Sequence, residues 1–499
     1  MTQRSPGLAT HYLRYSSANV LVMLAGLVSF PILTRLLDNT QYGILGYYDT
    51  WLLMAVAVAK MGAQHSILRF YPHDGDAARM QRFSTNLFYL PLLLSLLLWV
   101  LAGGGIVAAD WLTGRTQPAV FWMAMIMTPM LVYTSLVEAV LRITQRSRMV
   151  MVTRVAWRYM QLVFMLGAVI WVSHSADAAF AGKMIAAAAG MAFYVAWARG
   201  KLTFSRQELD LGEARQSLSY GLPLLATEML AVALVSIDRL MLKGLSGDFA
   251  VVGIYGVGAA LAMQVHMFMN LTVFEAFTPM ANRAYTSEGG AEAVRALKRR
   301  MLMPMMYASV GVAMLLWCLG TDLIIALSGQ GKAASGPVFA TMGATNALLP
   351  VMLVCAFGLS LERRTKTIMG LMLGAVAINA ALNWWWIPAF GVMGAAYATL
   401  VSSIASSTAS CLLVDRSLRQ FPDRRTVLTM IAAASAGIAG AWLTTRLDLR
   451  PGWQRMMLGG MMIGGPYLLT LLALDGRLRA LLQPKLRALE QRAGEGLAG

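Results

Sequence analysis

Fourteen long apolar stretches, separated by short polar segments, constrain this 499-residue chain more than any other feature. Each stretch is long enough for an α-helix to cross the roughly 30 Å of hydrocarbon in a bilayer. Helices are expected there because a backbone in lipid must satisfy its own hydrogen bonds. The sequence therefore predicts an all-α polytopic membrane protein with fourteen transmembrane helices. The stretches cover residues 15–34, 42–66, 83–109, 119–141, 155–172, 178–198, 216–242, 250–277, 301–327, 338–361, 367–386, 392–414, 427–445 and 456–474.

The composition supports a lipid environment. Hydrophobic residues make up 58% of the chain and charged residues only 13%, whereas a soluble domain has about 25% charged residues. The net charge is +17, but the basic residues form short clusters between apolar runs. A nucleic-acid surface would instead be a continuous basic patch or stripe. We therefore expect no nucleic-acid partner.

The basic residues also predict the topology. Most of the 41 Lys and Arg residues fall in every second connecting segment, and positive loops stay on the cytoplasmic side of a membrane. Both termini are therefore expected to be cytoplasmic. The first fourteen residues contain no apolar core of a signal peptide, so no cleavable leader is expected.

The sequence shows no pattern typical of an enzyme. The three cysteines lie in separate apolar runs and have no metal-ligand spacing. The segment Gly329-Gln-Gly331-Lys332 lacks the glycine spacing and the hydroxyl residue of a P-loop. We expect no catalytic residue, no metal and no cofactor.

A weak internal repeat divides the chain. The polar segment 199–215 separates two six-helix blocks that begin on the same side of the membrane. Arg35 ends a helix shortly before Gly43, and Arg239 ends one shortly before Gly253. This correspondence indicates two parallel repeats, with a chance match as the alternative. The expected parts are a first lobe at 1–200, a second at 201–420, helices 13 and 14 at 421–475, and a basic cytoplasmic tail at 476–499.

Three separated segments resemble signatures of the polysaccharide transporter (Wzx-type) flippases, a family of the multidrug/oligosaccharidyl-lipid/polysaccharide exporter superfamily. Each motif alone is modest, but they lie far apart and the helix count agrees along the chain. The segments are Leu33-Thr-Arg35-Leu-Leu-Asp38-x3-Tyr42-Gly43, Asp238-Arg239-x12-Val252-Gly253-Ile-Tyr255 and Asn379-x3-Asn383-x3-Ile387-Pro388-x2-Gly391-x2-Gly394-Ala-Ala-x-Ala398-Thr399.

The resemblance implies two six-helix lobes in a V, followed by two C-terminal helices. A cavity lined by helices 1, 2, 7 and 8 would open alternately to either side of a bacterial inner membrane. The implied cargo is a polyprenyl-diphosphate-linked oligosaccharide repeat unit, a precursor of O-antigen, capsule or exopolysaccharide, moved to the periplasmic leaflet. The implied partners are this lipid-linked oligosaccharide, membrane lipids, and the polysaccharide polymerase and export machinery. The implied state is a monomer.

Three alternatives remain open. A lipid II-type flippase belongs to the same superfamily, and helices 13 and 14 do not decide between the two cargoes. A small-molecule or drug cation antiporter predicts a narrower, more acidic or aromatic pocket. A membrane polymerase or glycosyltransferase needs a catalytic carboxylate on a sizeable external loop, and the predicted external loops are short.

Polar residues within the apolar stretches are the candidate site. Asp49 and Lys60 are separated by about 1,100° of helix, so they lie ~20° apart on one face, and Gln64 follows Lys60 at i+4. Glu228 and Arg239 have the same spacing as Asp49 and Lys60. His266 and Asn270 form another i, i+4 pair.

The implied cargo, an anionic diphosphate with a sugar head group, suggests three roles for these residues. Basic side chains would bind the diphosphate, polar ones would hydrogen-bond the sugar, and acidic ones would couple transport to H⁺ or Na⁺. The expected sets are Lys60, Arg239 and Arg35 for the first role, Gln64, His266, Asn270 and Asn19 for the second, and Asp49, Glu228 and Glu275 for the third.

Structural explanations stay open for several of these charges. Arg35 and Arg239 lie near outer helix ends, where long side chains reach the interface, and His266 can be satisfied by a neighbouring helix. Arg154 and Arg158 are expected to be interfacial anchors of the fifth helix. Glu138 and Arg142, at i and i+4, are expected to form a local ion pair.

Overall fold

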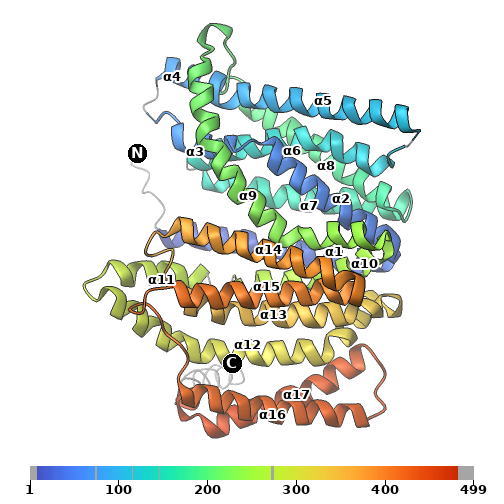
Figure 1. Cartoon of the computed structure of the whole chain (residues 1–499), viewed down its shortest axis with the longest axis vertical. Helices are drawn as coiled ribbons and strands as arrows, with labels where there is room; N and C mark the ends of the chain where they lie inside the picture. The colour runs from blue at the N-terminus through green and yellow to red at the C-terminus, as the bar shows by residue number, and fades with distance from the viewer. Residues whose placement is uncertain (1–7, 74–75, 115, 145, 271–274, 481–499) are drawn as a thin grey trace, which may run out of the picture. The chain divides into compact units, whose positions relative to one another are not determined.

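The computed structural model describes residues 8–73, 76–114, 116–144, 146–270 and 275–480, and every regular element in them is helical. Figure 1 follows the chain from the blue α1 to the red α17. The elements are α1 (Leu8–Leu36), α2 (Asn39–Ala59), α3 (Ala63–Phe70), α4 (Ala77–Phe83), the π-helix η1 (Ser84–Tyr89), α5 (Leu90–Thr113), α6 (Ala119–Ile143), α7 (Ser147–Trp171), α8 (Ala176–Ala198), the 3₁₀ turn η2 (Arg206–Glu208), α9 (Leu211–Ser246), α10 (Phe249–Met269), α11 (Glu275–Thr286), α12 (Gly290–Ser328), the 3₁₀ turn η4 (Gln330–Ser335), α13 (Gly336–Ala356), α14 (Thr365–Phe390), α15 (Val392–Leu413), α16 (Arg424–Arg446) and α17 (Trp453–Leu474).

The predicted all-α membrane fold is confirmed. Within the described ranges, twelve helices are long and apolar enough to cross a membrane, and each coincides with an expected span. The other two expected spans correspond to α1, whose searched apolar part is the shorter Val20–Leu36, and to α7, which contains Arg148, Arg154 and Arg158. The exact count of fourteen stays a prediction.

Backbone contacts divide the chain into two compact units. The first contains residues 1–256 and 376–395, and the second contains 257–375 and 396–499. The two units are defined by backbone contacts, whereas the expected lobes were defined by the sequence repeat. The lobe boundaries and the V-shaped arrangement of the lobes therefore stay predictions.

Helix packing in the first unit centres on α2, α6 and α8. Helix α6 packs against α2 and α8, and α7 lies against α1 and α8. The apolar core of the first unit includes the fully buried Phe88, Val137 and Phe180. The long α9 packs along α2 and α3, which brings polar residues of both segments together.

In the second unit, α12 is the central helix. It packs against α13, α16 and α17, and Ile463 and Tyr467 of α17 are buried with Met314 of α12 in one apolar cluster. Helices 13 and 14 of the sequence prediction, α16 and α17 here, therefore pack onto a helix of the core.

Candidate functional site

A break after α2 positions the central residue of the candidate site. The expected helix over 42–66 is wrong in this detail, because Lys60 caps α2 and the next two residues leave the helix. Met61 and Gly62 have φ values of 50° and 74°, in the left-handed region that favours glycine. A Cβ on Gly62 would lie 2.1 Å from the carbonyl oxygen of Gly221 in α9. Glycine at this turn therefore permits a close approach to α9.

The same approach is fixed by a hydrogen bond one turn further along. The Ser66 hydroxyl in α3 donates to the Ser217 carbonyl in α9 at 2.7 Å, and both serines are buried. The close backbone contact and this bond hold α3 against α9. Side chains at the α2–α3 break consequently face the next turns of α9.

Lys60 and Glu228 form an ion pair across this contact. The Lys60 ammonium contacts one carboxylate oxygen, and the Gln64 side-chain amide donates to the other. His65 Nε2 lies 3.9 Å from the same carboxylate. The Lys60 and Glu228 side chains are 12% and 23% exposed. Two predicted headgroup residues and one predicted coupling residue therefore lie together in a partly accessible cluster.

A second contact links α2 and α9 nearer their other ends. The Arg239 guanidinium lies 3.5 Å from the Thr50 hydroxyl. Lower residue numbers of α2 thus pair with higher numbers of α9, so the two helices run antiparallel. The shared face predicted for Glu228 and Arg239 is the face of α9 that meets α2.

Asp49 has a different partner from the rest of the predicted face. Both of its carboxylate oxygens accept hydrogen bonds from the Lys183 ammonium of α8 at 2.6 Å. Lys183 is 8% exposed and Asp49 is 38% exposed. Lys183 lies inside the expected span 178–198, and no periodicity links that span to α2. The presence of a lysine within an apolar helix was the one indication that an acidic partner lies nearby.

A buried polar network near Arg239 involves motif residues that the sequence had not assigned to the site. Asp238 accepts hydrogen bonds from the Tyr255 hydroxyl and, at 2.7 Å, from the Asn383 amide. Asn383 also donates to Asn379 at 3.0 Å. These residues come from α9, α10 and α14, and all four lie in the first unit.

The remaining predicted residues lie elsewhere or outside the description. In the second unit, the Asn270 amide contacts His266 Nε2 at 2.7 Å, which confirms the predicted i, i+4 contact. Arg35 is exposed in the last turn of α1. The side chains of Asn19 and Glu275 lie outside the described residues.

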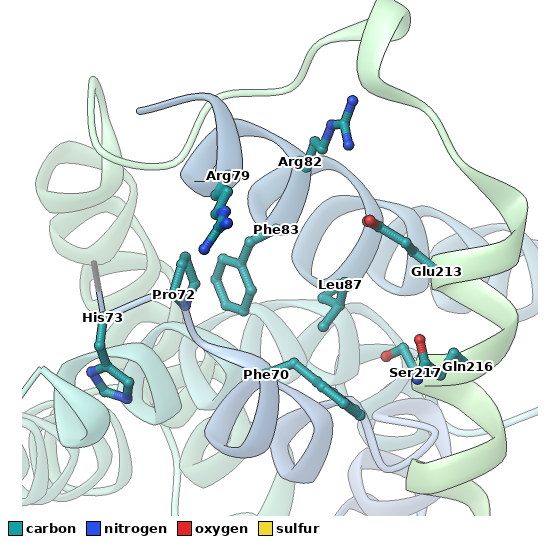
Figure 2. Close-up of a pocket in the computed structure, with 10 residues that line it drawn as sticks. All are labelled: Phe70, Pro72, His73, Arg79, Arg82, Phe83, Leu87, Glu213, Gln216 and Ser217. Carbon is teal, nitrogen blue, oxygen red and sulfur yellow. The ribbon is translucent and has the colours of Figure 1, made fainter. Parts of the chain in front are cut away.

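A cavity of about 620 Å³ is lined by residues of α3, α4, η1 and α9 and by the segment that follows α3. Figure 2 shows Phe83 and Leu87 beside the chain that follows α3, while Glu213, Gln216 and Ser217 line it from α9. Its two arginines already have acidic partners, since Arg82 binds Glu208 at 2.6 Å and Arg79 lies 3.7 Å from Asp76. The cavity therefore has little unpaired charge to offer a ligand.

The polar clusters among the described residues consist of ion pairs and hydrogen bonds between helices. In the described part of the chain, no group of three His, Cys, Asp or Glu side chains could hold a metal. The polar clusters instead pair lysines with carboxylates inside apolar helices, where an isolated charge is costly. The lysine of such a pair can bind another anion in place of the carboxylate without any change in covalent bonds.

Comparison with known proteins gives the family and the fold. Residues 10–284 match the family model described as "Polysaccharide biosynthesis protein". No curated protein matches the chain in sequence. The solved structure of the lipid II flippase MurJ, in an inward closed conformation, is similar with a TM-score of 0.69 and 10% identity, over 91% of this chain and 97% of that one.

Two multidrug transporters are also similar in fold. An inward-facing multidrug resistance MATE family transporter of the MOP superfamily aligns with a TM-score of 0.58 and 13% identity, over 80% of this chain and 96% of that one. The MATE multidrug transporter DinF-BH aligns with a TM-score of 0.53 and 18% identity, over 84% of this chain and 99% of that one. The family model covers more than half of the sequence, and the helical fold agrees with these transporters. The chain therefore belongs to the polysaccharide biosynthesis protein family, as a multi-pass membrane protein.

Proposed function

We propose that this protein is a flippase that moves a polyprenyl-diphosphate-linked oligosaccharide from the cytoplasmic to the periplasmic leaflet of a bacterial inner membrane. The family match supports a role in polysaccharide biosynthesis. The observation that carries the proposal is the partly accessible cluster of Lys60, Gln64 and Glu228 among apolar helices. It combines a cation for a diphosphate with an amide for a sugar.

The Lys60–Glu228 pair also suggests how cargo binds loosely enough to be released. In the empty carrier, Glu228 neutralises Lys60. An arriving diphosphate would compete with the carboxylate for the same ammonium group. Because the displaced carboxylate stays attached to α9, the cargo adds its own negative charge to the site, and Lys60 compensates part of it.

Glu228 and Asp49 are the proposed coupling groups among the described residues, with H⁺ or Na⁺ as the ion. Protonation of Glu228 would release Lys60 for the cargo, which links proton binding to headgroup binding. The termini are proposed to be cytoplasmic, because the basic segments fall on one side of the predicted topology. The proposed partners are membrane lipids and the polymerase and export machinery that receive the flipped unit.

The test is a gene deletion in the native host, followed by analysis of lipid-linked sugars and surface polysaccharide. The deletion should remove the polymer from the surface and make its lipid-linked repeat unit accumulate, and the wild-type gene should restore export. Arrest of cell-wall synthesis would instead favour a lipid II-type flippase. Normal polymer together with altered resistance to cationic drugs would favour an antiporter.

A further inference from the structure

A second cavity in the first unit, of about 310 Å³, is bounded by α1, α6 and α7. Arg154, Trp157 and Arg158 line it from α7, at positions i, i+3 and i+4 of one helix face. Ser135 and Glu138 line it from α6, three residues apart. The register of two packed helices therefore points these side chains into one space.

The two arginines bring unneutralised positive charge to this cavity. The Glu138 carboxylate already binds Arg142 at 3.3 Å and accepts the Tyr194 hydroxyl at 3.2 Å. Arg158 contacts a neutral group, the Gln161 amide oxygen, at 3.5 Å, and it interacts at longer range with the Asp49 carboxylate, which is already paired with Lys183. Among the described side chains, neither Arg154 nor Arg158 has a carboxylate within 4.0 Å.

Anchoring at the membrane interface does not account for both arginines. Arg154 is exposed, as an interfacial anchor would be. Arg158, one turn deeper, is partly buried and lines the cavity beside Trp157. The Trp157 ring is itself held against Tyr194, with ring centroids 6.5 Å apart. Trp157 thus forms an aromatic side of the cavity, and the two arginines have no carboxylate in direct contact among the described side chains.

We propose that this cavity is a second diphosphate subsite for the cargo, separate from Lys60 and occupied at another step of transport, with Arg154 and Arg158 each binding one phosphoryl group; this rests on the proposed function. One helical turn separates the two arginines by about 6 Å along the axis. The planar guanidinium fork suits phosphate oxygens. The volume takes the charged linkage rather than the whole oligosaccharide. The Ser135 hydroxyl is placed to hydrogen-bond the same group.

An anionic phospholipid offers similar phosphate chemistry, so charge distinguishes the two sources. A phosphodiester headgroup carries one phosphate charge, whereas a diphosphate linkage offers two phosphoryl groups to two arginines. The subsite should therefore prefer a prenyl diphosphate to a prenyl monophosphate. It should also retain that ligand when phosphatidylglycerol is present.

The experiment measures binding of farnesyl diphosphate and farnesyl monophosphate to the full-length protein in phosphatidylcholine nanodiscs, with empty nanodiscs subtracted. Arg154→Gln/Arg158→Gln should weaken diphosphate binding by about tenfold or more, as expected for loss of charge-assisted hydrogen bonds. The charge-matched control Arg199→Gln/Arg206→Gln changes two exposed arginines outside the cavity and should bind like the wild type. If the double variant does not fold, Arg154→Gln alone changes an exposed side chain and should still weaken binding.

Unchanged diphosphate affinity in folded Arg154→Gln would overturn the subsite. Equal affinity for the monophosphate, or complete displacement by phosphatidylglycerol, would overturn it as well. These results are separable from failure of the proposed function. A deletion strain with normal surface polymer rejects the function, whereas normal diphosphate affinity in the arginine variant rejects only the subsite.

Discussion

At the scale of single residues, the central feature is that two lysines of the apolar helices pair with carboxylates on other helices. An unpaired charge at the centre of a membrane helix costs about 2.5–3.5 kcal/mol on insertion scales. Lys60 meets Glu228, and Lys183 meets Asp49. Each pair joins helices far apart in sequence, so each also fixes which helices are neighbours.

The first prediction concerns Lys60. Lys60→Ala removes the proposed headgroup cation and leaves Glu228 without its ammonium partner, so export should fall by about tenfold or more, the loss of a charge-assisted hydrogen bond. Lys60→Arg keeps the charge and should retain partial export. Surface polysaccharide in the complemented deletion strain is the measurement, with the exposed Lys366→Ala as the control. Normal export by Lys60→Ala would remove Lys60 from the site.

The second prediction concerns the buried network around Asp238. Asp238→Ala leaves the Tyr255 hydroxyl and the Asn383 amide without this acceptor, and each buried unsatisfied group costs about 1–3 kcal/mol. The variant should melt at a clearly lower temperature in detergent, while Asp448→Ala, at an exposed loop position, should not. Equal melting temperatures for the two variants would show that the network is not structural.

The sequence predicted which polar residues form the candidate site, but it did not predict which of them pair with each other. Lys60, Gln64 and Glu228 could be identified because polar residues in apolar spans are energetically costly and usually have a functional or pairing role. The pairing of Asp49 with Lys183 could not be predicted, because helical periodicity places residues on a face of one helix only. It does not say that α8 lies beside α2.

At the scale of the elements, helix ends and close crossings determine the geometry of the first unit. The sequence predicted the spans well, since length and hydropathy are local properties. It missed the break after α2, because the apolar run continues through Met61 and Gly62. Gly43 and Gly253, corresponding positions of the weak repeat, pack against each other: a Cβ on Gly43 would lie 1.8 Å from the Phe249 carbonyl oxygen.

The third prediction tests that crossing of α2 and α10. Gly43→Ala should lower thermal stability and the yield of folded protein, because the added methyl group collides with the backbone of α10. Gly46→Ala is the matched control one turn along α2, where a Cβ has no atom within 4 Å. The expected loss for Gly43→Ala is about 1–3 kcal/mol. Equal melting temperatures for the two variants would contradict this close packing.

At the scale of the whole molecule, the alternation of basic segments predicts one orientation in the membrane. Hydropathy and charge were sufficient for the fold class, because lipid restricts a spanning chain to very few structures. The arrangement of the two lobes could not be predicted this way, since it depends on contacts between distant helices.

The fourth prediction tests the orientation with cysteine probes in a chain whose Cys318, Cys355 and Cys411 are replaced by serine. Probes at Gly289 and Arg424 should be shielded from an impermeant thiol reagent in intact cells. A probe at Thr113 should react. All three positions are exposed. The reverse labelling pattern would show that the orientation is inverted.

The most direct measurement of the central claim is translocation by the purified protein. Proteoliposomes would carry a fluorescent polyprenyl-diphosphate-linked oligosaccharide, and an impermeant quencher would report how fast it changes leaflet. The wild-type protein should speed translocation well above that in protein-free liposomes, and folded Lys60→Ala should not. If the folded wild-type protein leaves the rate at the protein-free level, while moving a cationic drug across the same membrane, the flippase account is wrong.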